Sequence, residues 1–211
     1  MSKVRAHISV SADGYVAGPN QSLENPLGEG GESLHDWVVA LQAWRERHGM
    51  EGGEVNASSA IMEESLANVG AEIMGRGKFG GGPGPWDDAW MGWWGDEPPF
   101  HMPVFVVTHH GREPVTLADT TFTFVTDGIQ SALEQARAAA AGKDVFIGGG
   151  ASIINQYLAA GVVDELELHL VPLVLGGGAR LFDGVGRDLR LEQVRAVEAP
   201  GVTHLKYRVV K

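Results

Sequence analysis

Alternating apolar and polar residues predict a β-strand near the start of the chain, over residues 3–10, where every second side chain from Val4 to Val10 is apolar. Short uninterrupted apolar runs, such as PVFVVT and DVFI, are typical of strands that helices cover on both faces of a parallel sheet. Together these two patterns predict further strands at residues 71–75, 103–108, 120–125, 144–147, 164–171, 189–197 and 203–210.

Apolar residues at helical spacing predict helices between these strands, over residues 34–44, 58–69, 127–141 and 152–160. In the first helix the apolar positions are i, i+3, i+4, i+7 and i+10, counted from Leu34, so they share one face. Gly70 would end the second helix. Asp127 with Gln130 resembles a capping box that opens the third.

The order of these elements predicts the fold class. Strands alternate with helices through most of the chain, and the last two strands follow each other with no helix between them. We therefore predict a single α/β domain over residues 1–211, with a mainly parallel sheet and an antiparallel C-terminal pair of strands at one edge. Residues 20–33 and 79–101, which are rich in glycine and proline, are predicted loops.

Composition limits the classes of function. The 211 residues are 44% hydrophobic and 20% charged, which is typical of a globular protein. The absence of cysteine excludes disulfides and thiolate zinc sites and favours a cytoplasmic location. No apolar run is long enough to span a membrane, so we expect no membrane partner. The net charge of −11 argues against a nucleic-acid partner, and an anionic ligand would need local positive charge.

Three consecutive glycines, Gly148, Gly149 and Gly150, separate a predicted strand from a predicted helix. Ligands of parallel sheets bind at the carboxyl ends of strands, and the free N–H groups at a helix start suit a phosphate that glycine allows to approach closely. A tight turn with close packing is the alternative, and the glycines alone leave both open. With Ile153 at its last position, the loop is not the G-x-G-x-x-G fingerprint.

Two other predicted strand ends carry groups that suit a phosphate. Arg76 and Lys78 follow the strand at residues 71–75, and Thr108 and His109 follow the strand at 103–108. An arginine can form a forked pair of charge-assisted hydrogen bonds to a phosphate. The alternative is a surface arginine that pairs with a carboxylate, and this alternative weakens because three strand ends share the same chemistry.

Several segments resemble the dihydrofolate reductase superfamily. They are SADGYVAG, MGRGKF, VVTH, IGGGASIINQYLAAGVVDEL and HLVPLVLGGGARLF, which begin at residues 11, 74, 106, 147 and 169. They occur in the order that the family has and span nearly the whole chain. The resemblance is closest to the branch that contains the reductase domain of bifunctional riboflavin-biosynthesis proteins and their stand-alone bacterial relatives.

The resemblance implies a dihydrofolate-reductase-like α/β fold, with a mostly parallel eight-stranded sheet, flanking helices and antiparallel C-terminal strands. It also implies NADPH as cofactor. Gly75, Arg76, Thr108 and His109 would bind the adenosine and its 2′-phosphate, and Val16 and Ala17 would flank the nicotinamide. The pyrophosphate would be held by the loop that consists of Gly148, Gly149, Gly150, Ala151, Ser152 and Ile153. The family also has a cis peptide in this loop, which would correspond to the Gly148–Gly149 bond.

Two residues depart from the family pattern. Lys78 stands where the family often has threonine, and it could either add charge to a phosphate or point to solvent. His109 stands where riboflavin-type relatives often have arginine, and a neutral histidine would bind a 2′-phosphate more weakly. The resemblance thus implies cofactor binding, whereas a neutral His109 argues against a strong preference for NADPH over NADH.

The family resemblance directs the search for a proton donor to the first helix. Dihydrofolate reductases use a carboxylate there, and Asp36 is the nearest match. An acid half-buried beside an apolar pocket would have a raised pKa, which suits proton delivery. Asp36 could instead cap the helix or face solvent. His35 and Asp13 are weaker candidates, and Asp13 could simply shape the turn with Gly14.

Four tryptophans, Trp86, Trp90, Trp93 and Trp94, lie in the predicted loop at residues 79–101. They could anchor the loop to the body of the protein or form a wall that stacks on a flat heterocycle, and we favour the first for most of them.

The function that these features predict is an NADPH-dependent reductase of a C=N or C=O bond in a pterin-like or pyrimidine-like heterocycle. The alternative is a non-catalytic nucleotide-binding protein that keeps the fold. We expect weak or no turnover of dihydrofolate, and a phosphorylated riboflavin precursor is doubtful because no second basic cluster is found. By resemblance we expect a homodimer, formed through the terminal strands.

Overall fold

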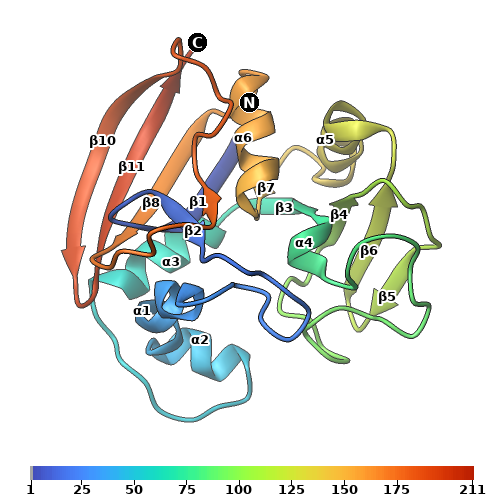
Figure 1. Cartoon of the computed structure of the whole chain (residues 1–211), viewed down its shortest axis with the longest axis horizontal. Helices are drawn as coiled ribbons and strands as arrows, with labels where there is room; N and C mark the ends of the chain where they lie inside the picture. The colour runs from blue at the N-terminus through green and yellow to red at the C-terminus, as the bar shows by residue number, and fades with distance from the viewer. Residues whose placement is uncertain (1) are drawn as a thin grey trace.

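A computed structural model describes residues 2–211, and its main feature is a nine-stranded sheet in the order β10-β11-β8-β1-β7-β3-β4-β6-β5 (Figure 1). The strands of this sheet are β1 (Val4–Ser11), β3 (Val69–Gly75), β4 (Pro103–Val107), β5 (Val115–Leu117), β6 (Thr120–Val125), β7 (Asp144–Ile147), β8 (Glu165–Val171), β10 (Arg190–Ala199) and β11 (Val202–Val210). Two short strands, β2 (Tyr15–Ala17) and β9 (Ala179–Arg180), form a separate pair.

The centre of the sheet is parallel and its two ends are antiparallel. Strands β8, β1, β7, β3, β4 and β6 run in the same direction, whereas β11 and β10 at one end and β5 at the other are antiparallel to their neighbours. This confirms the predicted fold class and the C-terminal hairpin at an edge. The expected number of eight strands is wrong, because the three-residue strand β5 pairs with β6 and adds a ninth.

Helices cover both faces of the sheet. They are the 3₁₀ helix η1 (Gly31–His35) and the α-helices α1 (Asp36–Val39), α2 (Gln42–Arg47), α3 (Ala57–Leu66), α4 (Arg76–Phe79), α5 (Gly128–Ala139) and α6 (Ala151–Ala159). Against one face, α5 and α6 bury the largest apolar cluster, which includes Leu133, Ile154 and Tyr157. None of the helices in residues 2–211 has the length and apolar character that crossing a membrane requires.

The helix predicted over residues 34–44 is broken into η1, α1 and α2. The break lies at Leu41, whose backbone is extended and forms a β-bridge with Glu54. Leu34, Trp37 and Leu41 are nevertheless buried together, as their spacing predicted. The apolar face was therefore predicted correctly, but pairing with a segment distant in sequence replaced continuous helix.

The predicted end of the second helix and the predicted capping box of the third are both wrong. Helix α3 ends at Leu66, and Gly70 lies within β3, where a Cβ atom would come within 2.6 Å of the Ala140 carbonyl oxygen. Gly70 is thus needed for close packing. The Asp127 side chain caps nothing, and the Gln130 amide donates to Glu134 instead of reaching back to the helix start.

The glycine-rich segment at residues 80–101 folds over the β4–β6 end of the sheet. Its aromatic side chains pack against a second apolar cluster that contains Phe79, Phe122 and Phe124. Trp86, Trp90 and Trp94 are partly buried there, whereas Trp93 is exposed. Most of the tryptophans therefore anchor the loop, which is the interpretation that we favoured.

Candidate active site

The carboxyl ends of β7, β3 and β4 lie side by side, because these three strands are parallel neighbours in the sheet. Two hydrogen bonds join the first two ends: Gly75 N–H donates to the Gly149 carbonyl at 2.9 Å, and Gly148 N–H donates to the Ile73 carbonyl at 2.9 Å. Thr108 follows directly after β4. The three loops that sequence analysis selected therefore meet at one edge of the sheet.

The glycine loop combines an unusual backbone with an open helix start. Gly149 has a φ of 96°, which favours glycine. The cis peptide is Gly149–Gly150, so its prediction at Gly148–Gly149 was one bond too early. Pairing with β3 continues through the Gly149 carbonyl, and the chain turns only after it. Helix α6 starts at Ala151 with no side-chain cap, which leaves the N–H groups of Ala151, Ser152 and Ile153 available to a ligand.

Close packing also requires a glycine at position 75. A Cβ atom there would lie 2.7 Å from Cγ1 of Ile153, so the strand end and the first turn of α6 touch through this glycine. Both interpretations of the glycines therefore have support, since packing fixes some of them and the helix start remains uncapped.

Arg76 is a cation without a carboxylate partner among the described residues. Its guanidinium lies 3.8 Å from the ring centre of Trp86, and Nη1 donates to the Gly84 carbonyl at 2.6 Å. Nε and Nη2 are buried and have no hydrogen-bond acceptor within residues 2–211. Burial lowers the pKa of Arg76. The alternative of a surface arginine with a carboxylate partner therefore does not apply to Arg76, and the unfilled donors favour an anionic ligand.

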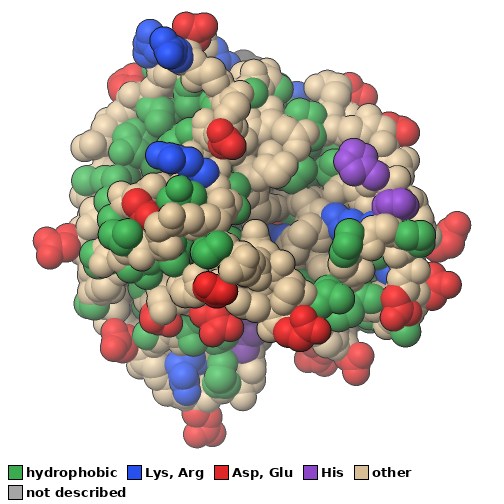
Figure 2. All heavy atoms as spheres, viewed as in Figure 1, with side chains coloured by type: hydrophobic (Ala, Val, Ile, Leu, Met, Phe, Trp, Pro, Cys, Tyr) green, Lys and Arg blue, Asp and Glu red, His purple; other side chains and the backbone are tan. Residues whose placement is uncertain are grey.

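Thr108 and His109 differ in exposure. Thr108 is buried. Its hydroxyl accepts from the His110 N–H at 3.2 Å and donates to the His110 carbonyl at 3.3 Å. His109 is exposed and lines a surface hollow with Trp86 and Arg112. Figure 2 shows histidine side chains close to basic ones on this side of the molecule. Acidic side chains are widespread over the rest of the face that the figure shows.

Val16 and Ala17 are buried in β2, which packs against β1 and pairs with β9. The Ala17 carbonyl lies against Gly178, where a Cβ atom would come within 2.1 Å of the oxygen. Val16 belongs to the same buried apolar cluster as Ala151 and Ile153 at the start of α6.

Lys78 does not point freely to solvent but pairs with a carboxylate, and its expected contribution of charge to a phosphate stays a prediction. Its Nζ donates to Oε1 of Glu72 at 2.8 Å, and the Glu72 side chain is only 6% exposed. A Cβ atom on Gly148 would lie 1.9 Å from this carboxylate oxygen and 2.7 Å from Lys78 Nζ. Sequence analysis missed Glu72, although an acidic residue inside the apolar segment AEIMG was a visible signal.

The environment expected for Asp36 is absent. Asp36 starts α1 with its side chain exposed, because the following residue, Trp37, takes the buried position. Asp13 accepts hydrogen bonds from the Ser11 hydroxyl and from the N–H groups of Leu175 and Gly176, which lower its pKa to about 2. Asp13 therefore braces a turn. Neither acid matches the half-buried proton donor that was expected.

His35 is more enclosed than either acid. Its Nδ1 is buried with no partner within residues 2–211, and burial, followed by the charge of Lys78, lowers its pKa.

Three further histidines form a buried chain on the face of the sheet that α1 and α3 cover. His169 lies 3.1 Å from His7 and 2.8 Å from His204 between ring nitrogens, and His204 continues to the Ser58 hydroxyl at 2.9 Å. Trp37 packs on the rings of His169 and His204. Burial lowers the pKa of His7 to about 3 and that of His204 to about 4, and it lowers the pKa of His169 well below the ordinary value.

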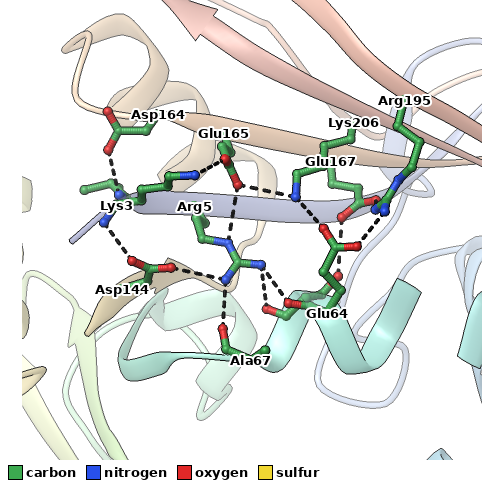
Figure 3. Close-up of polar contacts among 12 residues, drawn as sticks. Lys3, Arg5, Glu64, Ala67, Asp144, Asp164, Glu165, Glu167, Arg195 and Lys206 are labelled. Carbon is green, nitrogen blue, oxygen red and sulfur yellow. Dashed lines mark hydrogen bonds and ion pairs between the residues drawn. The ribbon is translucent and has the colours of Figure 1, made fainter. Parts of the chain in front are cut away.

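An ion-pair network continues this polar face beyond the histidines (Figure 3). Arg5, two residues before His7, contacts Asp144 at 3.3 Å and Glu165 at 3.7 Å. Glu64 on α3 joins Arg195 and Lys206 at 2.5 and 2.7 Å. These cations all have carboxylate partners, so they differ from Arg76.

Comparison with known proteins identifies the family. The family model for the RibD C-terminal domain matches residues 2–205, nearly the whole chain. The chain belongs to this family. YyaP of Bacillus subtilis, an uncharacterized protein, is 39% identical over 67 residues, which are 31% of this chain and 36% of YyaP. The match thus spans about a third of that relative.

Solved structures agree with the fold. A candidate riboflavin-biosynthesis protein from Shewanella sp. PV-4 superposes with a TM-score of 0.65 at 19% identity and covers 99% of both chains. Dihydrofolate reductase from Enterococcus faecalis, solved in complex with NADP(H), superposes with a TM-score of 0.55 at 12% identity and covers 99% of this chain and 97% of the reductase. At these identities the likeness concerns the fold.

The residues at the β7–β3–β4 edge fit a dinucleotide phosphate. Arg76 has buried donors without acceptors, and the start of α6 is uncapped. Both features suit an anion.

Proposed function

We propose that the protein is an NADPH-dependent reductase of a C=N or C=O bond in a small pterin-like or pyrimidine-like heterocycle. The observation that carries the proposal is the meeting of the glycine loop, Arg76 and Thr108 at the ends of three neighbouring parallel strands. Membership of the RibD C-terminal family supports it. When bound, the cofactor would supply the hydride.

Each part of the edge has a role in this proposal. The N–H groups of Ala151, Ser152 and Ile153 would bind the pyrophosphate, and Gly148, Gly149 and Gly150 would allow it to approach. Gly75 and Arg76, with Thr108 and His109, would hold the adenosine and its 2′-phosphate. Val16 and Ala17 would flank the nicotinamide. Arg76 is the side chain that would distinguish NADPH from NADH, since its unfilled donors suit the additional phosphate.

The first prediction concerns cofactor binding. At about 100 times its dissociation constant, NADPH should stabilise the folded protein by roughly 2.7 kcal/mol in thermal unfolding. Arg76→Gln should weaken NADPH binding by about 10-fold or more and leave NADH binding nearly unchanged, because only NADPH has the 2′-phosphate. Arg137→Gln, at an exposed position on helix α5, is the control and should bind both cofactors as the wild type does. No stabilisation by either cofactor would contradict the proposal.

A second candidate function is a nucleotide-binding protein without catalysis. The exposed position of Asp36 favours it, because the acid expected from dihydrofolate reductases is not in a suitable environment. This candidate predicts tight NADPH binding without NADPH oxidation over a panel of pterins and pyrimidines. Oxidation with any member of the panel would reject it.

A further inference from the structure

The Lys78–Glu72 pair lies directly against the first glycine of the proposed cofactor loop. Glu72 is in β3, next to Phe146 in register on β7, and Gly148 follows two residues later on the same face. A Cβ atom on Gly148 would overlap the carboxylate of Glu72 and the ammonium group of Lys78. Lys78 Nζ is therefore in contact with the backbone at the point where the loop leaves the sheet.

The pair also faces the polar side of the sheet, because Glu72 and Arg5 are both in register with Phe146. His7 packs its ring against Phe146 at 4.5 Å, and the charge of Lys78, after burial, lowers the pKa of both His7 and His35. Both imidazoles are consequently neutral near pH 7. Arg5 also acts on His7, but Asp144 and Glu165 hold its guanidinium. Lys78, whose side chain is 31% exposed, has one carboxylate partner and further N–H donors.

A buried carboxylate in this place needs its partner. An isolated carboxylate inside a protein is costly, and pairing with an ammonium group offsets that cost. Lys78 has three N–H donors, one of which goes to Glu72. The other two remain available to a substrate.

We propose that Lys78 is the catalytic proton donor of this reductase and that Glu72 positions it. The inference rests on the proposed function. As hydride adds to the carbon of the substrate C=N or C=O bond, the π electron pair moves to the nitrogen or oxygen, which takes a proton from Lys78 Nζ. Lys78 becomes a neutral amine and regains a proton from solvent through its exposed part. The hydride would come from NADPH, which would be oxidised to NADP⁺.

The test measures how Lys78 affects the two oxidation states of the cofactor. The nicotinamide ring is positively charged in NADP⁺ and neutral in NADPH, whereas the phosphates are the same in both. Lys78→Met should therefore raise the affinity for NADP⁺ relative to NADPH by about three- to ten-fold, because it removes a like charge that the proposal places beside the ring. Glu72→Gln should change this ratio in the opposite direction. Isothermal titration calorimetry with each form gives the ratio without any substrate.

Lys206→Met is the matched control, because Lys206 also pairs with carboxylates but lies in the ion-pair network. Its ratio should equal that of the wild type. An unchanged ratio in Lys78→Met would overturn the inference, since Lys78 would then act on the phosphates or on neither group. Failure of the wild type to bind either form would reject the proposed function itself, which is a separate outcome.

A kinetic measurement completes the test on any heterocycle that the wild type reduces. Lys78→Arg keeps the positive charge but removes a group that can readily release a proton. It should lower the single-turnover rate about 100-fold. An unchanged single-turnover rate in Lys78→Arg would overturn the inference.

Discussion

At the level of single residues, Glu72 shapes the candidate site because a carboxylate in a buried strand requires both a partner and space. Lys78 provides the partner at 2.8 Å, and the missing side chain of Gly148 provides the space. Gly148 is thus fixed by packing, although its position at the start of the loop suggested a role in ligand approach.

Gly148→Ala should destabilise the protein by about 1–3 kcal/mol, because the new methyl group would overlap the Glu72 carboxylate. Denaturant unfolding measures this change. Gly77→Ala is the control: a Cβ atom at Gly77 meets nothing within 4 Å, so its stability should stay within about 0.5 kcal/mol of the wild type. Equal stability of the two variants would show that the carboxylate is not held against Gly148.

At the level of elements, three strands place histidines in one buried row. His7 is on β1, His169 on β8 and His204 on β11, and the pairing of these strands brings their rings together. The same face is covered by α1 through Trp37 and by α3 through Ser58. These histidines are neutral in the folded state because burial disfavours their charged form.

The row predicts acid sensitivity. The folded pKa values of His7 and His204, about 3 and 4, lie below the ordinary value of 6.5, so the unfolded chain binds more protons between these limits. The free energy of unfolding should therefore rise with pH from about 4 to 6.5 and be level above that. Each histidine that stays neutral in the folded protein should lower the free energy of unfolding at pH 5 by about 2 kcal/mol relative to pH 8.

Urea unfolding at pH 5 and pH 8 measures this difference. His204→Gln should reduce the difference in unfolding free energy between the two pH values by the contribution of one histidine. His48→Gln, a change at an exposed position, should not alter this difference. Carboxylates with lowered pKa values, such as Glu64, lose stabilisation only at lower pH and do not account for the change between pH 5 and 8. A flat profile between pH 5 and 8 would contradict the neutral row.

At the level of the whole molecule, the strand order decides both the site and the exposed edges. Placing β7, β3 and β4 next to one another brings together loops that are about 30 to 70 residues apart in the chain. The same order leaves β10 at one end of the sheet, with Val194 60% exposed beside a register shift. An unpaired edge strand can pair with a second chain.

We propose that the protein forms a homodimer through β10. Light scattering coupled to size-exclusion chromatography should give twice the mass of 22.5 kDa, and Val194→Lys should give a monomer that keeps its far-UV circular dichroism. Glu113→Lys, on the surface hollow near the opposite end of the sheet, is the control. A wild-type monomer, or a dimer unaffected by Val194→Lys, would contradict this proposal.

The sequence by itself determined the elements and the phosphate-compatible groups. Periodicity located most strands, and three strand ends with glycine, arginine or threonine indicated one ligand edge, because these signals are local and parallel strands end together. The tertiary structure decided what local signals do not contain: the break at Leu41, the ninth strand, the exposure of Asp36, and the pairing of Glu72 with Lys78. Each depends on which residues become neighbours in space, and those neighbours also decide whether a polar residue is buried or exposed.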